Sequence, residues 1–215
     1  MLVVTEQQIP DPSPPGDRGP AWYAGPVPAE YRVHGFVFTP LTTGLVREDY
    51  AAVMTSAAYL RWWSASTWPT DDFTFAENEQ DLQWHDDEHR ERVAFTYSVL
   101  DAGALDAASF DAGHRRVVGC IYIRPFSTAC STRGVVCPPD LLTRADAVAR
   151  GWLIDEFAAQ RSDFTDVVLA WLCSDAWQLP GAWWQERCDG EAGELGPAHV
   201  ADRVVGGWSF RQRVR

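Results

Sequence analysis

The sequence predicts an α+β fold in which most of the sheet is antiparallel. The chain has 215 residues, which is enough for one domain with a sizeable core. Segments with strand and helix periodicity follow one another in the order β α α β β β α β. No internal repeat and no alternating βαβ pattern occurs, so a doubly wound nucleotide-binding fold is not expected.

The first 30 residues are expected to form a proline-rich arm ahead of a single domain over 31–215. Residues 10–28 hold seven of the 14 prolines together with three glycines, and this composition excludes a regular helix. Trp22 and Tyr23 are the expected anchors of the arm on the domain.

The elements of the domain follow from residue periodicity and from the residues that end each run. A strand over 31–41 stops at Pro40, which lacks the amide hydrogen that a sheet needs. A helix then begins near Gly44, because Tyr50, Val53 and Leu60 recur at three- and four-residue steps. The remaining elements are a helix over 77–92, strands over 93–100, 116–124 and 147–154, a helix over 163–177 and a strand over 203–210, with no element expected between Pro180 and 203.

Charge and composition exclude several classes of function. Thirty acidic residues against 18 basic ones give a formal charge of −12, which repels phosphate backbones, so no nucleic-acid partner is expected. Every basic residue is Arg, which excludes Schiff-base chemistry and a lysine base. No apolar stretch of about 18 residues is present, so no membrane span is expected.

The cysteines and the start of the chain predict a cytoplasmic protein. Five cysteines are an odd number, and the first ten residues lack the basic flank and apolar stretch of a secretory signal. Cys130 and Cys137 flank a turn-like segment and could pair, but zinc spacing is absent.

One local motif is typical of a metal site. His85, Glu88 and His89 match the inverted zinc-protease pattern His-x-x-Glu-His, and a helix places the two imidazoles one turn apart on one face. Glu156 is the one candidate for a third ligand. We expect no metal here, because the neighbouring acids read as an ordinary solvated helix face and the two histidines as packed, hydrogen-bonded residues.

Other catalytic motifs are absent from the sequence. No Gly-x-Ser-x-Gly elbow, Walker loop or Gly-x-Gly-x-x-Gly motif occurs. Cys120 lies inside a predicted strand, where a free cysteine packs as a small apolar residue more often than it reacts.

A set of spaced segments over about residues 35–178 resembles a branch of the GNAT superfamily of acyl-CoA-dependent N-acetyltransferases. The segments are Phe-Thr-Pro-Leu at 38–41, Asp-Tyr-Ala-Ala-Val-Met at 49–54, Leu-Arg-Trp-Trp at 60–63, Trp-Pro at 68–69, Asn78 with Asp-Leu at 81–82, His-Asp-Asp-Glu-His at 85–89, Phe-Thr-Tyr-Ser-Val-Leu-Asp at 95–101 and Val-Gly-Cys-Ile-Tyr-Ile-Arg-Pro at 118–125. The resemblance implies a central, mostly antiparallel sheet flanked by helices. That sheet would splay open between the strand ending at Arg124 and the strand ending at Ile154, with acyl-CoA lying in the splay.

The resemblance also implies roles for particular residues. Acyl-CoA as cosubstrate would lie beside Cys120, Ile121, Tyr122 and Ile123, with Tyr122 as the acid for the leaving thiolate. His85, Glu88 or His89 would act as the base toward a small amine or amino-acid derivative.

The turn that should bind the pyrophosphate departs from the pattern of the family. Residues 154–166 contain no glycine, and Asp155, Glu156 and Asp163 would repel a pyrophosphate, whereas Arg161 would partly substitute for the missing turn. Two hypotheses therefore stand: an N-acyltransferase with a small-molecule acceptor, or a non-catalytic GNAT-fold protein that has lost CoA binding and now binds a ligand or a partner. The sequence leaves a homodimer open.

Overall fold

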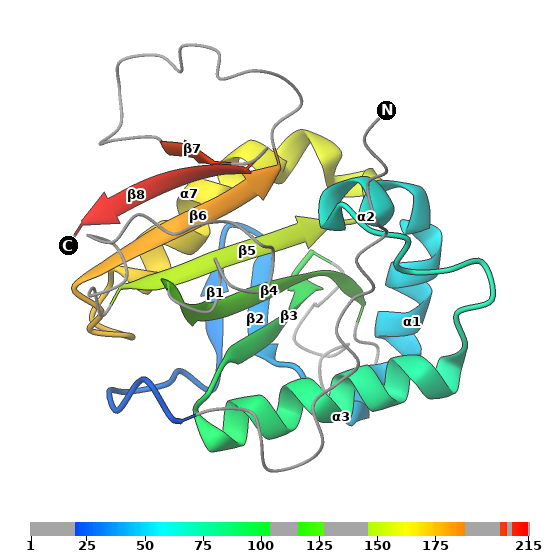
Figure 1. The fold of residues 1–215 in the computed structure, drawn as a ribbon, viewed down its shortest axis with the longest axis horizontal. Helices are drawn as coiled ribbons and strands as arrows, with labels where there is room; N and C mark the ends of the chain where they lie inside the picture. The colour runs from blue at the N-terminus through cyan, green and yellow to red at the C-terminus, as the bar shows by residue number, and fades with distance from the viewer. Residues whose placement is uncertain (1–19, 104–115, 127–145, 188–202, 206–207, 215) are drawn as a thin grey trace, which may run out of the picture.

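The structure, a computed structural model, describes residues 20–103, 116–126, 146–187, 203–205 and 208–214. These residues form one eight-stranded sheet in the order β1-β2-β3-β4-β5-β6-β8-β7 (Figure 1). Six of the seven neighbouring pairs are antiparallel, and β5–β6 is the parallel pair. The predicted α+β class with a mostly antiparallel sheet is confirmed.

The elements follow one another along the chain much as the sequence predicts. The strands are β1 (Tyr31–Val33), β2 (Phe36–Pro40), β3 (Phe95–Asp101), β4 (Val117–Pro125), β5 (Ala147–Leu153), β6 (Gly181–Arg187), β7 (Arg203–Val205) and β8 (Trp208–Val214). The helices are α1 (Val46–Thr55), α2 (Ala57–Ser64), α3 (Phe75–Glu91) and α7 (Arg161–Leu172), with 3-10 turns η1 (Thr43–Leu45) and η2 (Asp155–Gln160).

Three predicted elements are divided in the structure. The strand over 31–41 is the hairpin β1–β2, whose turn at His34 and Gly35 uses positive φ angles of 46° and 83°, as tight hairpin turns require. The first helix is α1 and α2, separated at Ser56. The strand over 203–210 falls in two strands, β7 and β8, which pair antiparallel. Cys130 and Cys137 lie outside the described residues.

The strand β6 is the element that the sequence analysis missed. Its first five residues, 181–185, are all buried, so the strand lacks the apolar-polar alternation that marks a half-exposed strand. It is nevertheless central, because it connects the first five strands with the β8–β7 pair.

The expected splay lies one strand further along the sheet than the sequence analysis placed it. The strands β4 and β5 remain paired from Gly119↔Leu153 to Pro125↔Ala147, so the expected divergence between them is wrong. Pairing of β5 with β6 instead ends at Ala149↔Trp184. The reason is topological: α7 forms the crossover between these two strands, which makes them the parallel pair and lets them part beyond their first residues.

Helices cover both faces of the sheet. Cys120 on β4 faces Asp49 of α1, whereas Gly151 on the neighbouring strand faces Phe164 of α7. Because adjacent residues of a strand point to opposite faces, α1 and α7 lie on opposite faces, as Figure 1 shows. None of the described helices is long and apolar enough to cross a membrane.

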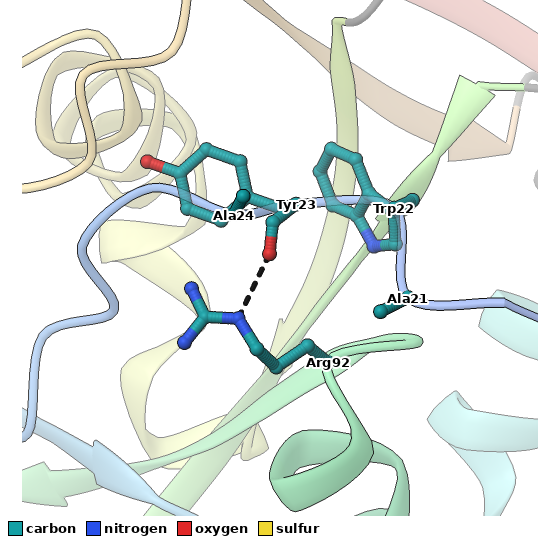
Figure 2. A pocket seen from close by; sticks show the side chains of 5 residues that line it. All are labelled: Ala21, Trp22, Tyr23, Ala24 and Arg92. Atoms are coloured by element: carbon teal, nitrogen blue, oxygen red, sulfur yellow. Dashed lines mark hydrogen bonds between the residues drawn. The ribbon is translucent and has the colours of Figure 1, made fainter.

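The helix α3 is fixed at both ends. Thr74 and Glu77 form a reciprocal capping box at its start, and Arg92 ends it in the left-handed conformation. The Arg92 guanidinium donates to the carbonyl oxygen of Tyr23 (Figure 2) and to that of Gly25, which ties the N-terminal arm to this end of the helix. The expected anchoring by Trp22 and Tyr23 is confirmed, because both rings pack against the core. The arm and domain boundaries at 30 and 31 stay a prediction.

Candidate functional site

A row of polar side chains lies between β4 and the helices α1 and α3. Cys120, Tyr122 and Arg124 alternate along β4 and therefore share one face of the sheet. Opposite them, α1 contributes Asp49, and α3 contributes residues at helical spacing, namely Asn78, Asp81, His85 and Glu88.

Asp49 is a carboxyl group in the core, with 3% of its surface exposed. Asn78 donates from Nδ2 to its Oδ2 at 3.0 Å, and Cys120 donates from Sγ to its Oδ1 at 3.5 Å. Burial raises the pKa of Asp49 to about 6, because these hydrogen bonds only partly offset the loss of water around the charge. Burial, followed by the charge of Asp49, raises the pKa of the Cys120 thiol well above its usual value, so this thiol is a poor nucleophile.

Tyr122 and His85 face each other in the middle of the row. Their ring centroids are 5.4 Å apart, and Trp152 Nε1 donates to the Tyr122 hydroxyl at 3.4 Å. His85 Nδ1 lies 3.0 Å from Glu88 Oε2, and an Arg124 nitrogen lies 3.7 Å from the same oxygen. Burial acts to raise the pKa of Glu88, but the hydrogen bond with His85 and the charge of Arg124 outweigh it and the pKa falls. Burial raises the pKa of Tyr122 well above its usual value.

A small cavity lies within this row. It measures about 30 Å³ and is lined by Asp49, Asp81, His85 and Tyr122 among others. That is room for one or two water molecules. A larger and more open hollow of about 420 Å³ lies between the N-terminal arm and Arg92, which is its one charged lining residue (Figure 2). The Arg92 guanidinium already holds two backbone carbonyls of the arm, so we place the candidate site at the polar row.

The two histidines of the motif at 85–89 each contact other side chains of the fold. Glu88 bonds His85, whereas the His89 ring lies among aromatic rings, 5.2 Å from Phe95 and 5.3 Å from Tyr97. Burial lowers the pKa of His89. Over the ranges that the structure describes, no three His, Cys, Asp or Glu side chains are grouped to hold a metal ion. Glu156 forms an ion pair with Arg116, the residue directly before β4.

The strand β4 is not the open edge that the sequence analysis assigned to acyl-CoA. Cys120, Ile121 and Ile123 pair with β3 on one side and with β5 on the other, so their backbone groups are already in use. The stretch that is free of a neighbouring strand on the β6 side is instead residues 150–153 of β5, where pairing with β6 has ended, although its Leu153 carbonyl oxygen accepts from Arg161. On the α7 face this stretch is closely packed, since a Cβ at Gly151 would come within 3.1 Å of the Trp184 ring.

The turn after β5 does not fit a pyrophosphate. Its place is taken by η2, which begins with the exposed carboxylates of Asp155 and Glu156, 65% and 62% accessible. Arg161 does not extend toward a ligand, because it donates to the Leu153 carbonyl oxygen at 2.8 Å and pairs with Asp155 at 2.8 Å. Oriented free amides and a net positive field are the features of a phosphate-binding turn, and this turn presents carboxylates instead.

The helix α2 covers the divergence of β5 and β6 with three arginine–aromatic contacts. The guanidinium of Arg161 lies 3.5 Å from the Tyr59 ring centroid and that of Arg150 lies 3.5 Å from the Trp63 centroid. Arg187 at the end of β6 lies 5.6 Å from the Trp62 centroid and donates to the carbonyl oxygen of the same residue. These contacts join α2 to α7, β5 and β6.

Sequence reasoning missed Asp49 as a site residue, although a signal was present. Asp49 lies four residues before Val53 and three before Ala52, so it is on the buried face of α1. A carboxyl at such a position needs partners, which Asn78 and Cys120 supply.

Comparisons with known proteins identify the fold. No family model matches the chain, and no curated protein matches it. Several solved structures match along most of their length. The microcin C7 self-immunity acetyltransferase MccE, in complex with acetyl-CoA and AMP, is 10% identical with a TM-score of 0.56, over 89% of this chain and 99% of that one.

Two ribosomal-protein acetyltransferases match similarly. The ribosomal L7/L12 α-N-protein acetyltransferase RimL is 13% identical with a TM-score of 0.55, over 89% of this chain and 100% of that one. The ribosomal-protein-S5-alanine acetyltransferase from Vibrio fischeri is 12% identical with a TM-score of 0.52, over 87% and 97%. The chain therefore has the fold of the GNAT acetyltransferases, as the resemblance in its sequence predicts.

Proposed function

We propose that this protein is an N-acyltransferase that takes an acyl group from acyl-CoA and transfers it to a small amine or amino-acid derivative. The observation that carries the proposal is the divergence of the parallel strands β5 and β6 immediately beside a buried row of acid–base groups. Trp152 connects the two features, since it lies on the free stretch of β5 and bonds Tyr122. Acyl-CoA, when bound, supplies a thioester as the acyl donor.

In this proposal Tyr122 donates a proton and His85 accepts one. Tyr122 stays protonated at neutral pH because burial raises its pKa, so its hydroxyl is a proton donor. His85 is held by the Glu88 carboxylate, which orients the ring and stabilises it when it takes a proton from an amine. His89 lies one turn away among aromatic rings, and we assign it no contact with the acceptor. No step is assigned to the pyrophosphate end, because the acidic turn does not fit that group.

Binding of acetyl-CoA tests the proposal first. A ligand at a hundredfold excess over its Kd raises the Tm of a chain of this size by about 5–10 °C. We expect such a rise with acetyl-CoA, and release of CoA thiol when a panel of amines and amino acids is added. Tyr122→Phe and His85→Gln should then lower kcat about 10²-fold or more, whereas Asp71→Asn at an exposed position should not. Absence of any shift at millimolar acetyl-CoA contradicts the enzyme hypothesis.

The acidic turn favours a second candidate function, a non-catalytic ligand- or partner-binding protein on the GNAT fold. Residues 154–166 contain no glycine, although the resemblance implies a glycine-rich turn, and Asp155 and Glu156 are exposed there while Arg161 is engaged in the fold. Under this hypothesis, wild-type protein does not bind acetyl-CoA, and the double variant Asp155→Gly, Glu156→Gly gains measurable affinity. If both proteins fail to bind while remaining folded, the divergence itself does not accept the cofactor.

The compartment is part of the same proposal. Cys120 is a buried free thiol, as is usual in the reducing cytoplasm, where acyl-CoA donors are also made. We therefore propose a cytoplasmic protein.

A further inference from the structure

The face of the sheet that carries Tyr122 continues across the divergence to three further residues. Val148 pairs with Trp183, so Arg150 and Gln185, each two positions further on, point to the same face. Arg187 pairs with Trp208, which places Trp208 of β8 on this face as well. Arg150, Gln185 and Trp208 therefore lie on three successive strands beneath α2.

Arg150 carries a charge that the described part of the chain does not neutralise. Its guanidinium lies between two indole rings, 3.5 Å from the Trp63 centroid and 5.2 Å from the Trp208 centroid. Its Nη2 donates to the carbonyl oxygen of Trp63 at 3.0 Å. Its Nε is buried and has no hydrogen-bond partner, and within the described ranges no carboxylate pairs with it.

Gln185 presents a second unused donor, on the neighbouring strand and on the same face of the sheet. The residue is 3% exposed, and its Nε2 is buried without a partner. To reach Trp208 on β8, the Arg150 side chain crosses β6 on the face where Gln185 lies. Two unsatisfied donors on neighbouring strands, one of them on a permanent cation, carry a desolvation cost that an oxygen anion between them would remove.

We propose that Arg150 and Gln185 form a binding site for the carboxylate of a small molecule. A carboxylate offers two oxygens in one plane, which suits a guanidinium edge and a nearby amide, and the indoles of Trp63 and Trp208 exclude water around it. The overall charge of −12 opposes a polyanion more strongly than a monoanion. Resting on the proposed acyltransferase function, the site assigns the acceptor to the class of amino acids with a free carboxylate.

The test compares acids with their own amides, in the absence of acyl-CoA. Glycine, leucine, phenylalanine and glutamate are each paired with the corresponding α-carboxamide and titrated to about 10 mM while the Tm of the full chain is measured. We expect at least one acid to raise the Tm by about 5 °C or more above its amide, which corresponds to a Kd in the submillimolar range.

Two variants link the shift to the site. Gln185→Met removes the unpaired amide with little change in volume, so the free protein should keep its stability while affinity for the acid falls about tenfold or more. Arg150→Met should abolish the selectivity for acid over amide, and Arg32→Met, at an exposed arginine on β1, should leave it unchanged.

The outcomes separate this inference from the proposed function. Equal shifts for acid and amide in every pair overturn the carboxylate site, as does full retention of the shift in Gln185→Met. Selective binding of an acid by a protein that does not bind acetyl-CoA upholds the carboxylate site and contradicts the acyltransferase. Binding of acetyl-CoA by a protein that does not prefer acids to their amides upholds the acyltransferase and contradicts the carboxylate site.

Discussion

Asp49→Asn should make the protein more stable at neutral pH and less sensitive to pH. Burial raises the pKa of Asp49 from 3.8 to about 6, so the folded state holds this proton more tightly than the unfolded state does. The stability that protonation provides is complete below pH 3.8 and is lost as the pH rises to about 6. Each pKa unit corresponds to about 1.4 kcal/mol of free energy. The free energy of unfolding of the wild-type protein is therefore lower by about 3 kcal/mol at pH 7 because of this group.

The amide that the Asp49→Asn substitution introduces causes no such pH-dependent loss of stability. Its oxygen can accept the hydrogen bond that Asn78 donates to the wild-type carboxylate at 3.0 Å, and the group stays neutral at every pH. We therefore expect nearly equal free energies of unfolding for wild type and variant at pH 4. At pH 7 the variant should be more stable by up to about 3 kcal/mol, or roughly 6–12 °C in Tm.

Urea unfolding at half-unit intervals from pH 4 to pH 7.5 measures this difference. Asp71→Asn, at a carboxylate that is 94% exposed, is the matched control and should parallel the wild type. Parallel stability curves for wild type and Asp49→Asn would refute the reasoning, because they would mean that Asp49 is solvated or tightly paired as an anion.

Two further predictions concern the sheet and the helix that frame the site. Gly119→Ala should lower the free energy of unfolding by about 3 kcal/mol or more, because the new Cβ would lie 2.0 Å from the Trp152 carbonyl oxygen; Gly44→Ala, whose Cβ has ordinary contacts, is the control in urea unfolding. Thr74→Ala should cost about 1 kcal/mol through loss of the α3 capping box, and Thr74→Ser should restore it.

Local patterns were sufficient to predict much of the fold. The strands β3, β4 and β5 and the helix α3 lie within a few residues of their predicted bounds, because each has a clear periodicity and a clear end. The pairing of β5 with β6 could not be predicted in the same way. Recognition of β6 depends on burial of both of its faces, and burial is a property of the assembled sheet.

The candidate site shows the same limit. Helical spacing brings His85 and Glu88 together, and the structure places them in contact. Their approach to Tyr122 depends on how α3 packs against β4, which no local pattern encodes. Arg150 and Gln185 were missed because they lie 35 positions apart and become neighbours only through the crossover by α7.

The attachment of α2 has a kinetic consequence for any molecule that approaches the divergence from that side. Each guanidinium–ring contact is worth about 0.5–2 kcal/mol, and Tyr59, Trp62 and Trp63 hold their three partners from one short helix. Because the rings share a rigid backbone, displacing the helix breaks the contacts together rather than one at a time. The rate of entry from that side is therefore proportional to the fraction of molecules in which the whole helix is displaced.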